Sequence, residues 1–146
     1  MLFRSKSATT NRNLGDAYSH LGRKGDAKRA YLKAVEQAQE EVAVATSNAR
    51  AIARLAVYQA KAGDDAAAVR SITRAQSLVA DDQQVWLRSA VVHALARRQG
   101  PALDALEKAI AKGYSKRLIA EEEDFSFLRP LPRFAAMIST PAEVKP

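Results

Sequence analysis

Asp16 and His20 are the pair of side chains in this chain that comes nearest to a metal-binding pattern. They are four residues apart, a helical spacing that places both on one face, where they could share a metal ion. Two ligands do not complete a metal site, and a pair at this spacing on a helix is more often solvated. We therefore predict no metal here.

No other group of residues forms a recognisable catalytic pattern. The sequence has no nucleophile elbow and no glycine-rich phosphate loop. The acidic run at 121–124 could attract a cation, but it lacks the spaced oxygen ligands of a calcium loop and is better interpreted as a solvated helix end. No cysteine is present, which excludes disulfides and thiolate metal sites. The sequence predicts no enzyme, no metal and no cofactor.

Alanines at regular intervals indicate the elements that position these side chains. The chain has thirty alanines, six glycines and five prolines. Alanine is the best helix former and lets helix axes approach closely. Three units align on their alanines. They carry Leu14, Gly15, Tyr18, Ala27, Tyr31 and Ala34; then Leu55, Ala56, Gln59, Ala68, Ile72 and Ala75; then Trp86, Ser89, Ala90, His93, Ala102, Leu106 and Ala109.

The spacing of the units is that of a helical repeat. Ala68 and Ala102 are 34 residues apart, whereas Ala27 and Ala68 are 41 apart. The difference is about two helical turns, so the second helix of the first unit can be longer without turning its face. The stretch Thr46-Ser47-Asn48 is its expected end. His93 occupies the position in the third unit that Tyr18 occupies in the first, and we expect it to make a core contact.

A 34-residue period with a Leu-Gly, Tyr, Ala and aromatic pattern resembles the tetratricopeptide repeat. The resemblance covers about residues 8–116 and implies an all-α, right-handed superhelical stack of three helical hairpins. The expected helices are 9–22, 26–45, 49–62, 65–79, 83–98 and 101–112. Asp26, Asp64 and Asp81 are expected to cap helices, and Pro101 to lie in a first turn. Leu14, Gly15 and Tyr18 are expected to form the packed face of the first helix.

The predicted organisation assigns every part of the chain. We expect a disordered leader at 1–7, repeats at 8–48, 49–82 and 83–116, a cap at 117–140 and a disordered tail at 141–146. The last thirty residues contain Phe125, Leu128, Phe134, Met137 and Ile138, which suit the uncovered end of a solenoid, with Pro132 beginning a terminal helix and Phe134 as the main anchor. The alternative is a linear motif held out for a partner.

The tail pattern Asp-x-x-x-Leu-Arg-x-x-Pro-Arg-Phe resembles the segment that closes repeat arrays in bacterial Ser/Thr kinases and membrane-bound regulators. This resemblance implies the sensory or docking end of a larger signalling protein. The chain carries no kinase residue, so no kinase activity is implied.

The face of each first helix opposite the packed one is the predicted binding groove. In tetratricopeptide proteins these faces line the concave surface. The groove residues are Arg12, Asp16, His20, Arg50, Arg54, Val57, Lys61, Leu87, Arg88, Val91 and Leu95. The first two units are cationic and the third is apolar, which suits a protein or peptide with an acidic end and a hydrophobic end. The apolar part could instead be covered by the tail of the chain itself.

A net charge of +7 keeps nucleic acid as an alternative partner. Lys24, Lys28, Arg29 and Lys33 cluster, but acids are interleaved and the aromatics that would stack on bases fall in repeat columns. We therefore favour a protein-binding adaptor, scaffold or sensor over a nucleic-acid-associated helical repeat. No apolar run reaches the length of a membrane span. We expect a soluble protein, with a cytoplasmic location slightly favoured.

Overall fold

The computed structural model describes residues 2–139, and these residues form an all-α fold without a strand. The elements are α1 Leu2–His20, α2 Lys24–Val44, α3 Ala49–Lys61, α4 Asp65–Leu78, α5 Gln83–Leu95, α6 Gln99–Ala111, α7 Lys116–Glu121, a 3₁₀ turn η1 Glu123–Phe125 and α8 Pro132–Ser139. Among them, none is long and apolar enough to cross a membrane.

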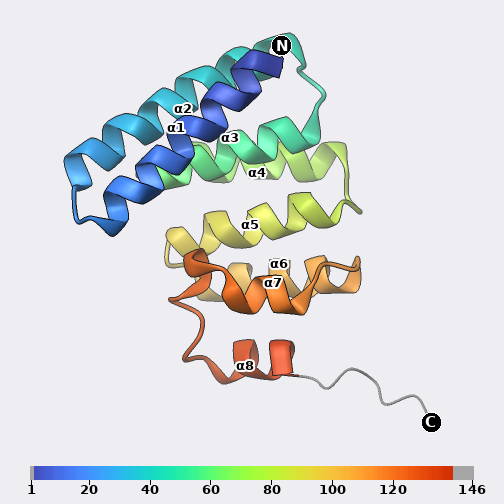
Figure 1. The fold of residues 1–146 in the computed structure, drawn as a ribbon. Coiled ribbons are helices and arrows are strands. Elements are labelled where there is room, and N and C mark those ends of the chain that lie inside the picture. Colours follow the sequence, from blue (N-terminus) through green and yellow to red (C-terminus); the bar gives the residue numbers. More distant parts are fainter. Residues whose placement is uncertain (1, 140–146) are drawn as a thin grey trace.

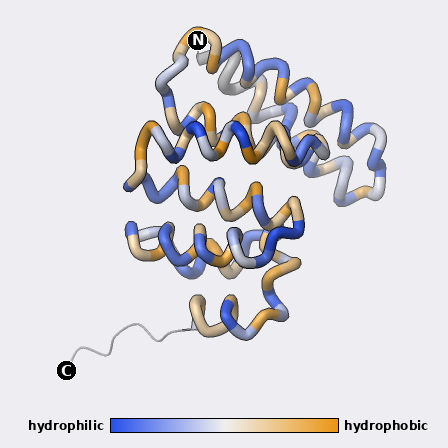
Figure 2. The backbone as a smooth tube through the Cα atoms, turned by 180° about the vertical axis from the view of Figure 1, so that it is seen from behind, coloured by the Kyte–Doolittle hydropathy of each residue, from blue (hydrophilic) through white to orange (hydrophobic). Residues whose placement is uncertain are grey.

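Consecutive helices pack against each other and build up a stack (Figure 1). The closest pairs are α1 with α2, α3 with α4 and α5 with α6, and α3 also packs on α5. Alanines at the helix contacts are completely buried, as at Ala34, Ala68 and Ala102. Hydrophobic and hydrophilic residues alternate along the helices (Figure 2), as expected when each helix buries one side.

Three glycines end helices, and one of the three predicted aspartate caps is confirmed. Gly22, Gly63 and Gly113 have positive φ angles of 73°, 91° and 99°, the conformation that ends a helix at low cost for glycine. Asp64 accepts a hydrogen bond from the backbone N–H of Ala67, as expected. The other two predicted aspartate caps are wrong, and for different reasons.

The cap of α5 is Asp82 rather than Asp81. Its carboxylate accepts hydrogen bonds from the backbone N–H groups of Gln84 and Val85, because the chain enters the helix one residue later than the capping-box pattern indicates. Asp26 lies inside the first turn of α2, where it pairs with Arg23 and Arg29. The cap position there belongs to Arg23, whose side chain makes no cap hydrogen bond.

The first helix differs most from expectation. It begins at Leu2, so residues 2–7, predicted as a disordered leader, extend the helix; no glycine or proline interrupts them, and Ala8 is buried. Leu14 is 43% exposed, so the predicted packed face is wrong there. Gly15 instead packs on the ring of Tyr31, which turns Leu14 outward. The predicted tail at 141–146 lies outside the described residues.

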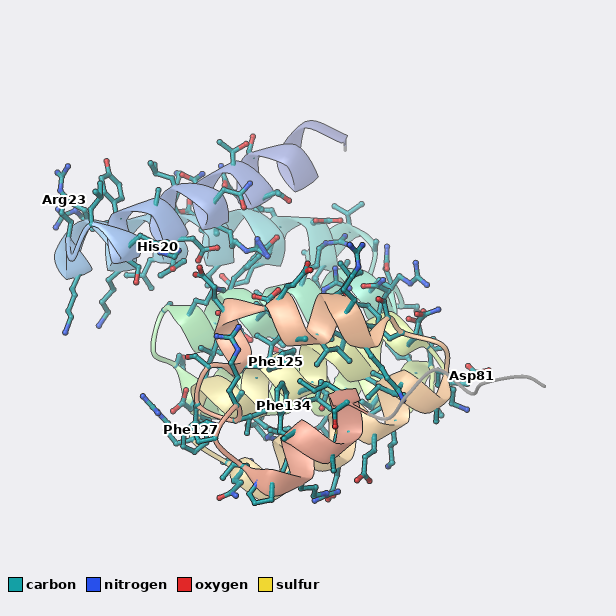
Figure 3. The ribbon with its side chains drawn as sticks, turned by 60° about the horizontal axis from the view of Figure 1, so that its bottom comes forward. His20, Arg23, Asp81, Phe125, Phe127 and Phe134 are labelled. Atoms are coloured by element: carbon teal, nitrogen blue, oxygen red, sulfur yellow. The ribbon has the colours of Figure 1, made fainter. Side chains whose placement is uncertain are left out.

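The C-terminal elements fold back on the stack. Phe134 is buried, as predicted, and Phe125 shares its role: their ring centroids are 6.5 Å apart (Figure 3). η1 packs on α5, and α8 packs on α6 and α7. At the surface, the Arg133 guanidinium pairs with Asp104 at 2.7 Å and with Glu107 at 3.0 Å.

Candidate functional site

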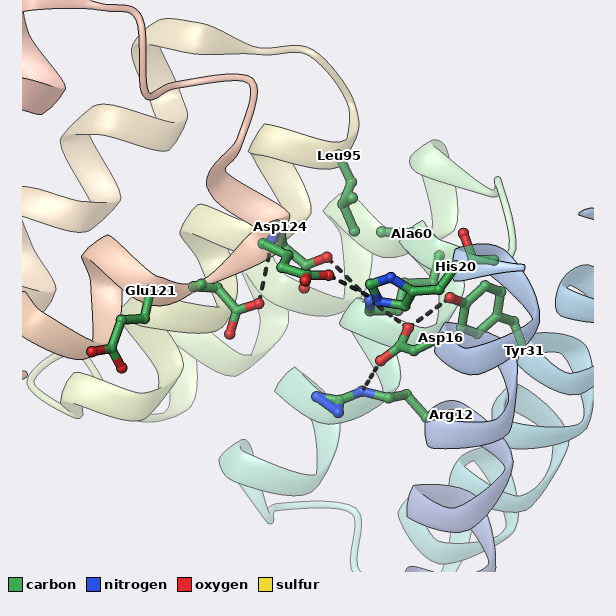
Figure 4. Close-up of a pocket in the computed structure, with 12 residues that line it drawn as sticks. Arg12, Asp16, His20, Tyr31, Ala60, Leu95, Glu121 and Asp124 are labelled. Atoms are coloured by element: carbon green, nitrogen blue, oxygen red, sulfur yellow. Dashed lines mark hydrogen bonds and ion pairs between the residues drawn. The ribbon is translucent and has the colours of Figure 1, made fainter. Parts of the chain in front are cut away.

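A cavity of about 470 Å³ opens between α1, the C-terminal end of α3 and the segment that enters η1 (Figure 4). It forms because α1 packs closely against α2 but makes few contacts with α3. By contrast, α3 packs directly on α5. Side chains, rather than packed helices, bridge this space. The lining residues are Arg12, Asp16, Ser19, His20, Tyr31, Ala60, Lys61, Leu95 and the acidic run at 121–124.

Lys61 joins three distant parts of the chain inside this cavity. Its Nζ donates hydrogen bonds to Asp16 Oδ1 at 2.9 Å and to Asp124 Oδ1 at 3.1 Å. The lysine side chain is only 8% exposed, whereas the two carboxylates are 30% and 19% exposed. A buried ammonium needs such partners, since desolvation without them would disfavour its charge. Asp16 and Asp124 therefore hold α1 and η1 onto the end of α3.

Tyr31 completes the bridge from α2. Its Oη donates a hydrogen bond to Asp16 Oδ1 at 2.6 Å. Burial raises the pKa of Tyr31 well above the ordinary value, and the hydrogen bond and negative charge of Asp16 raise it further. The Tyr31 phenol thus stays protonated at physiological pH and acts as a hydrogen-bond donor that orients Asp16. The phenol is therefore unsuited to a role as a general base.

Arg12 and His20 lie at opposite sides of Asp16 on α1. Arg12 Nε is 3.5 Å from Asp16 Oδ2, too far for a hydrogen bond, and this buried nitrogen has no hydrogen-bond partner. His20 Nε2 lies 2.9 Å from Glu123 Oε2, and both side chains are largely exposed. Asp16 and His20 therefore make separate contacts, each with another segment of the chain.

The cavity is acidic overall. Five lining residues carry carboxylates, namely Asp16 and residues 121–124, against the two permanent cations Arg12 and Lys61. The Asp16 and Asp124 carboxylates are engaged by Lys61, whereas Glu121 projects from the end of α7 (Figure 4). Within residues 2–139 no three histidine or acidic side chains are grouped so that they could hold a metal ion.

A second cavity of about 370 Å³ adjoins the first and shares Ser19, Tyr31 and Lys61 with it. Its other lining residues are Lys24, Ala27, Lys28, Ala62 and Gly63. Lys24 and Lys28 lie on the first turns of α2, and both are exposed. This cavity is therefore bordered by cations above a floor of small residues.

The arginines of the predicted groove have partners within the protein. Arg50 donates to Asp82 at 2.8 Å, Arg54 to Glu41 at 3.0 Å and Arg88 to Gln84 at 3.3 Å. Burial lowers the pKa of Arg88, and the nearby charge of Arg54 lowers it further. The charges of Arg50 and Arg54 are thus compensated by carboxylates within the protein, whereas Arg88 bonds to a neutral amide.

The apolar part of the predicted groove belongs to the core. Val57 and Val91 are each 6% exposed, and Leu87 and Leu95 pack against the same core cluster. η1 lies against α5, which corresponds to the alternative in which the tail covers this face. The structure thus brings together five of the predicted groove residues around the first cavity, Arg12, Asp16, His20, Lys61 and Leu95.

Sequence reasoning missed several residues of the two cavities. Tyr31 occupies an aromatic position of the repeat pattern, and nothing in the sequence indicates a contact of its hydroxyl group. Lys24 and Lys28 stand out in the sequence only as part of a basic cluster. The run at 121–124 is visibly acidic, but its placement beside Lys61 depends on a contact between residues 63 positions apart.

Comparison with models of known protein families and with the sequences of curated proteins finds no match to this chain.

Proposed function

We propose that this protein is an interaction module, a right-handed superhelical stack of three tetratricopeptide-like hairpins, that binds an extended segment of another protein. The pairing of α1 with α2, α3 with α4 and α5 with α6, together with the 34-residue spacing of the buried Ala68 and Ala102, supports this architecture. A docking or scaffolding role within a larger signalling protein fits the same interpretation.

The first cavity is the observation on which the proposed site rests. Its volume of about 470 Å³ is large enough for one or two side chains, and its lining comes from α1, α2, α3, α5, the end of α7 and η1. Carboxylates outnumber permanent cations five to two in this lining. A basic side chain of the partner is therefore the group that this cavity accommodates best.

The lining favours binding over catalysis. Tyr31 holds its proton, Lys61 is occupied by two carboxylates, and His20 is exposed beside Glu123. No nucleophile among these residues contacts a base that could activate it. We therefore propose a non-enzymatic role without a cofactor.

A peptide selection tests this proposal. A randomised peptide library displayed on phage would be selected against the whole chain, and the affinity of selected peptides measured by fluorescence anisotropy. Glu121→Gln with Glu123→Gln should weaken binding by about tenfold, the loss of about 1.4 kcal/mol. The matched control is Glu36→Gln with Asp65→Asn, two exposed acids outside both cavities. Equal losses in both variants would contradict the assignment of the site.

Nucleic-acid binding is the second candidate, and the exposed Lys24 and Lys28 beside the second cavity favour it. The rest of that basic cluster is compensated, since Arg29 pairs with Asp26 and Lys33 lies 3.6 Å from Glu36. Binding of generic RNA or DNA with a steep decrease in affinity as salt increases would support this candidate. A shallow salt dependence would favour the peptide.

A further inference from the structure

The two cavities adjoin each other and differ in the charge of the residues that line only one of them. They share Ser19, Tyr31 and Lys61, so a bound chain can pass from one to the other across these residues. Lys24 and Lys28 border only the second cavity, whereas residues 121–124 border only the first. The sign of the charge therefore changes along the surface.

Lys61 lines both cavities, but its positive charge is already compensated by carboxylates of the protein. Its ammonium is held by Asp16 and Asp124 at 2.9 Å and 3.1 Å, so the available cations of the second cavity are Lys24 and Lys28. These lysines are four residues apart on α2, a spacing that places both on one face of the helix. A carboxylate between them would relieve the repulsion of two like charges.

The floor of the second cavity gives a polypeptide room to approach. Ala27, Ala62 and Gly63 line it with small side chains. A Cβ placed on Gly63 would meet no atom within 4 Å, which shows open space above the turn from α3 to α4. The main chain of a ligand can therefore lie against this turn while its side chains reach the charged ends.

We propose that the ligand is an extended protein segment with a fixed order of charge, an acidic side chain between Lys24 and Lys28 and a basic side chain toward Glu121 and Glu123. This inference rests on the proposed function and adds the second cavity to it. Nucleic acid fits this surface less well, because a phosphate backbone crossing from one cavity to the other would meet the carboxylates of residues 121–124.

A double-mutant cycle on the selected peptides tests the charge order. Peptides retained by the phage selection should carry an acid at a constant distance from a basic residue. Replacing that acid by its amide should weaken binding to the unmodified protein about tenfold, whereas it should strengthen binding to the Lys24→Glu, Lys28→Glu variant, because the amide removes the repulsion between the peptide acid and the two new carboxylates. The control is Lys33→Glu with Lys112→Glu, which makes the same charge change away from both cavities.

The outcomes separate this inference from the proposed function. Selected peptides that depend on Glu121 and Glu123 but contain no acid, or that ignore the Lys24→Glu, Lys28→Glu change, would overturn the charge order and leave the proposed function intact. Failure to select any peptide sensitive to Glu121 and Glu123 would overturn both. Competition of single-stranded RNA with the peptide, dependent on Lys24 and Lys28, would assign the second cavity to a polyanion instead.

Discussion

The α8 end of the molecule packs through aromatic rings, whereas α1 reaches α3 and η1 mainly through charged side chains. Phe125, Leu128 and Phe134 are no more than 1% exposed. On the other side, Asp16, Lys61 and Asp124 form a bridge whose carboxylates still contact solvent. The contacts of α8 are sealed by apolar burial, whereas the junction of α1 with α3 and η1 is held by directional contacts around open space.

This difference shows how one short chain combines a stable end with an open one. Burial of apolar surface is non-directional and closes the space between elements. A charged bridge fixes the distance between α1 and α3 but leaves room beside it, because its members require solvent or hydrogen-bond partners. The cavities are found at the polar junction for this reason.

The largest expected effect is at the aromatic end. Phe134→Ala should lower the free energy of unfolding by about 3–5 kcal/mol, because it removes a buried ring and leaves a cavity beside Phe125. Chemical denaturation monitored by circular dichroism measures this loss. The control Ala135→Ser changes an exposed residue on the same helix and should be nearly neutral. Equal stability of the two variants would show that α8 does not seal the stack.

Breaking the polar junction should have a smaller and more local effect. Lys61→Met leaves Asp16 and Asp124 close together without their cation, and we expect a loss of about 2–3 kcal/mol. This is below the range of about 3–5 kcal/mol for a fully buried pair, since both carboxylates keep some solvent. Hydrogen exchange should accelerate in α1 more than in α5. Uniform acceleration along the chain would contradict a local bridge.

The contact of Gly15 with Tyr31 tests how closely α1 must approach α2. A methyl group at this position would collide with the Tyr31 ring. Gly15→Ala should therefore destabilise the fold by about 1–2 kcal/mol, even though alanine favours a helix. Gly25→Ala is the matched control, because it lies in the first turn of α2 and its Cβ would meet only the end of the Arg29 side chain, at 3.8 Å. It should be neutral or stabilising by thermal denaturation.

The smallest expected effect concerns Asp82, the N-cap of α5, which belongs neither to the aromatic contacts of α8 nor to the Lys61 bridge. Burial alone would raise the pKa of Asp82, but hydrogen bonds from Arg50 and from the backbone N–H groups of Gln84 and Val85 lower it below 3.8. Asp82 should contribute about 1 kcal/mol to the free energy of unfolding. This contribution should be present above pH 3.8 and lost as the pH decreases through the lowered pKa of Asp82 in the folded state. Asp82→Ala should remove this pH dependence. Asp81→Ala, at an exposed neighbour, should retain it.

Local sequence patterns predicted the helices more successfully than the surface they form. Gly63, Gly113, Asn48 and Asp64 act within a few residues, so the turns and helix ends near them agree with expectation. The face of α1 could not be predicted from periodicity alone. Leu14 and Gly15 are adjacent in α1, and which of them faces the neighbouring helix depends on its contact with Tyr31 of α2.

The candidate site depended even more on distant contacts. The sequence places Arg12, Asp16, His20 and Lys61 in one predicted groove. It does not indicate which carboxylates compensate the positive charges of that groove. Asp124 neutralises Lys61 only because the tail returns to α3, and Glu41 neutralises Arg54 only because the long α2 reaches past it. Such pairings have no sequence signal at the level of a single helix.

The Lys61 bridge also has a consequence for the order of folding. Helical pairs form from contacts close in sequence, and a stack of such pairs can nucleate at any of them. The hydrogen bonds of Lys61 join residues 45 and 63 positions apart, so each of them closes a long loop of the chain. We expect this junction to form last, since loop closure must precede it. Only a chain with both ends folded then presents the complete cavity, and a partner that binds there discriminates finished molecules from partly folded ones.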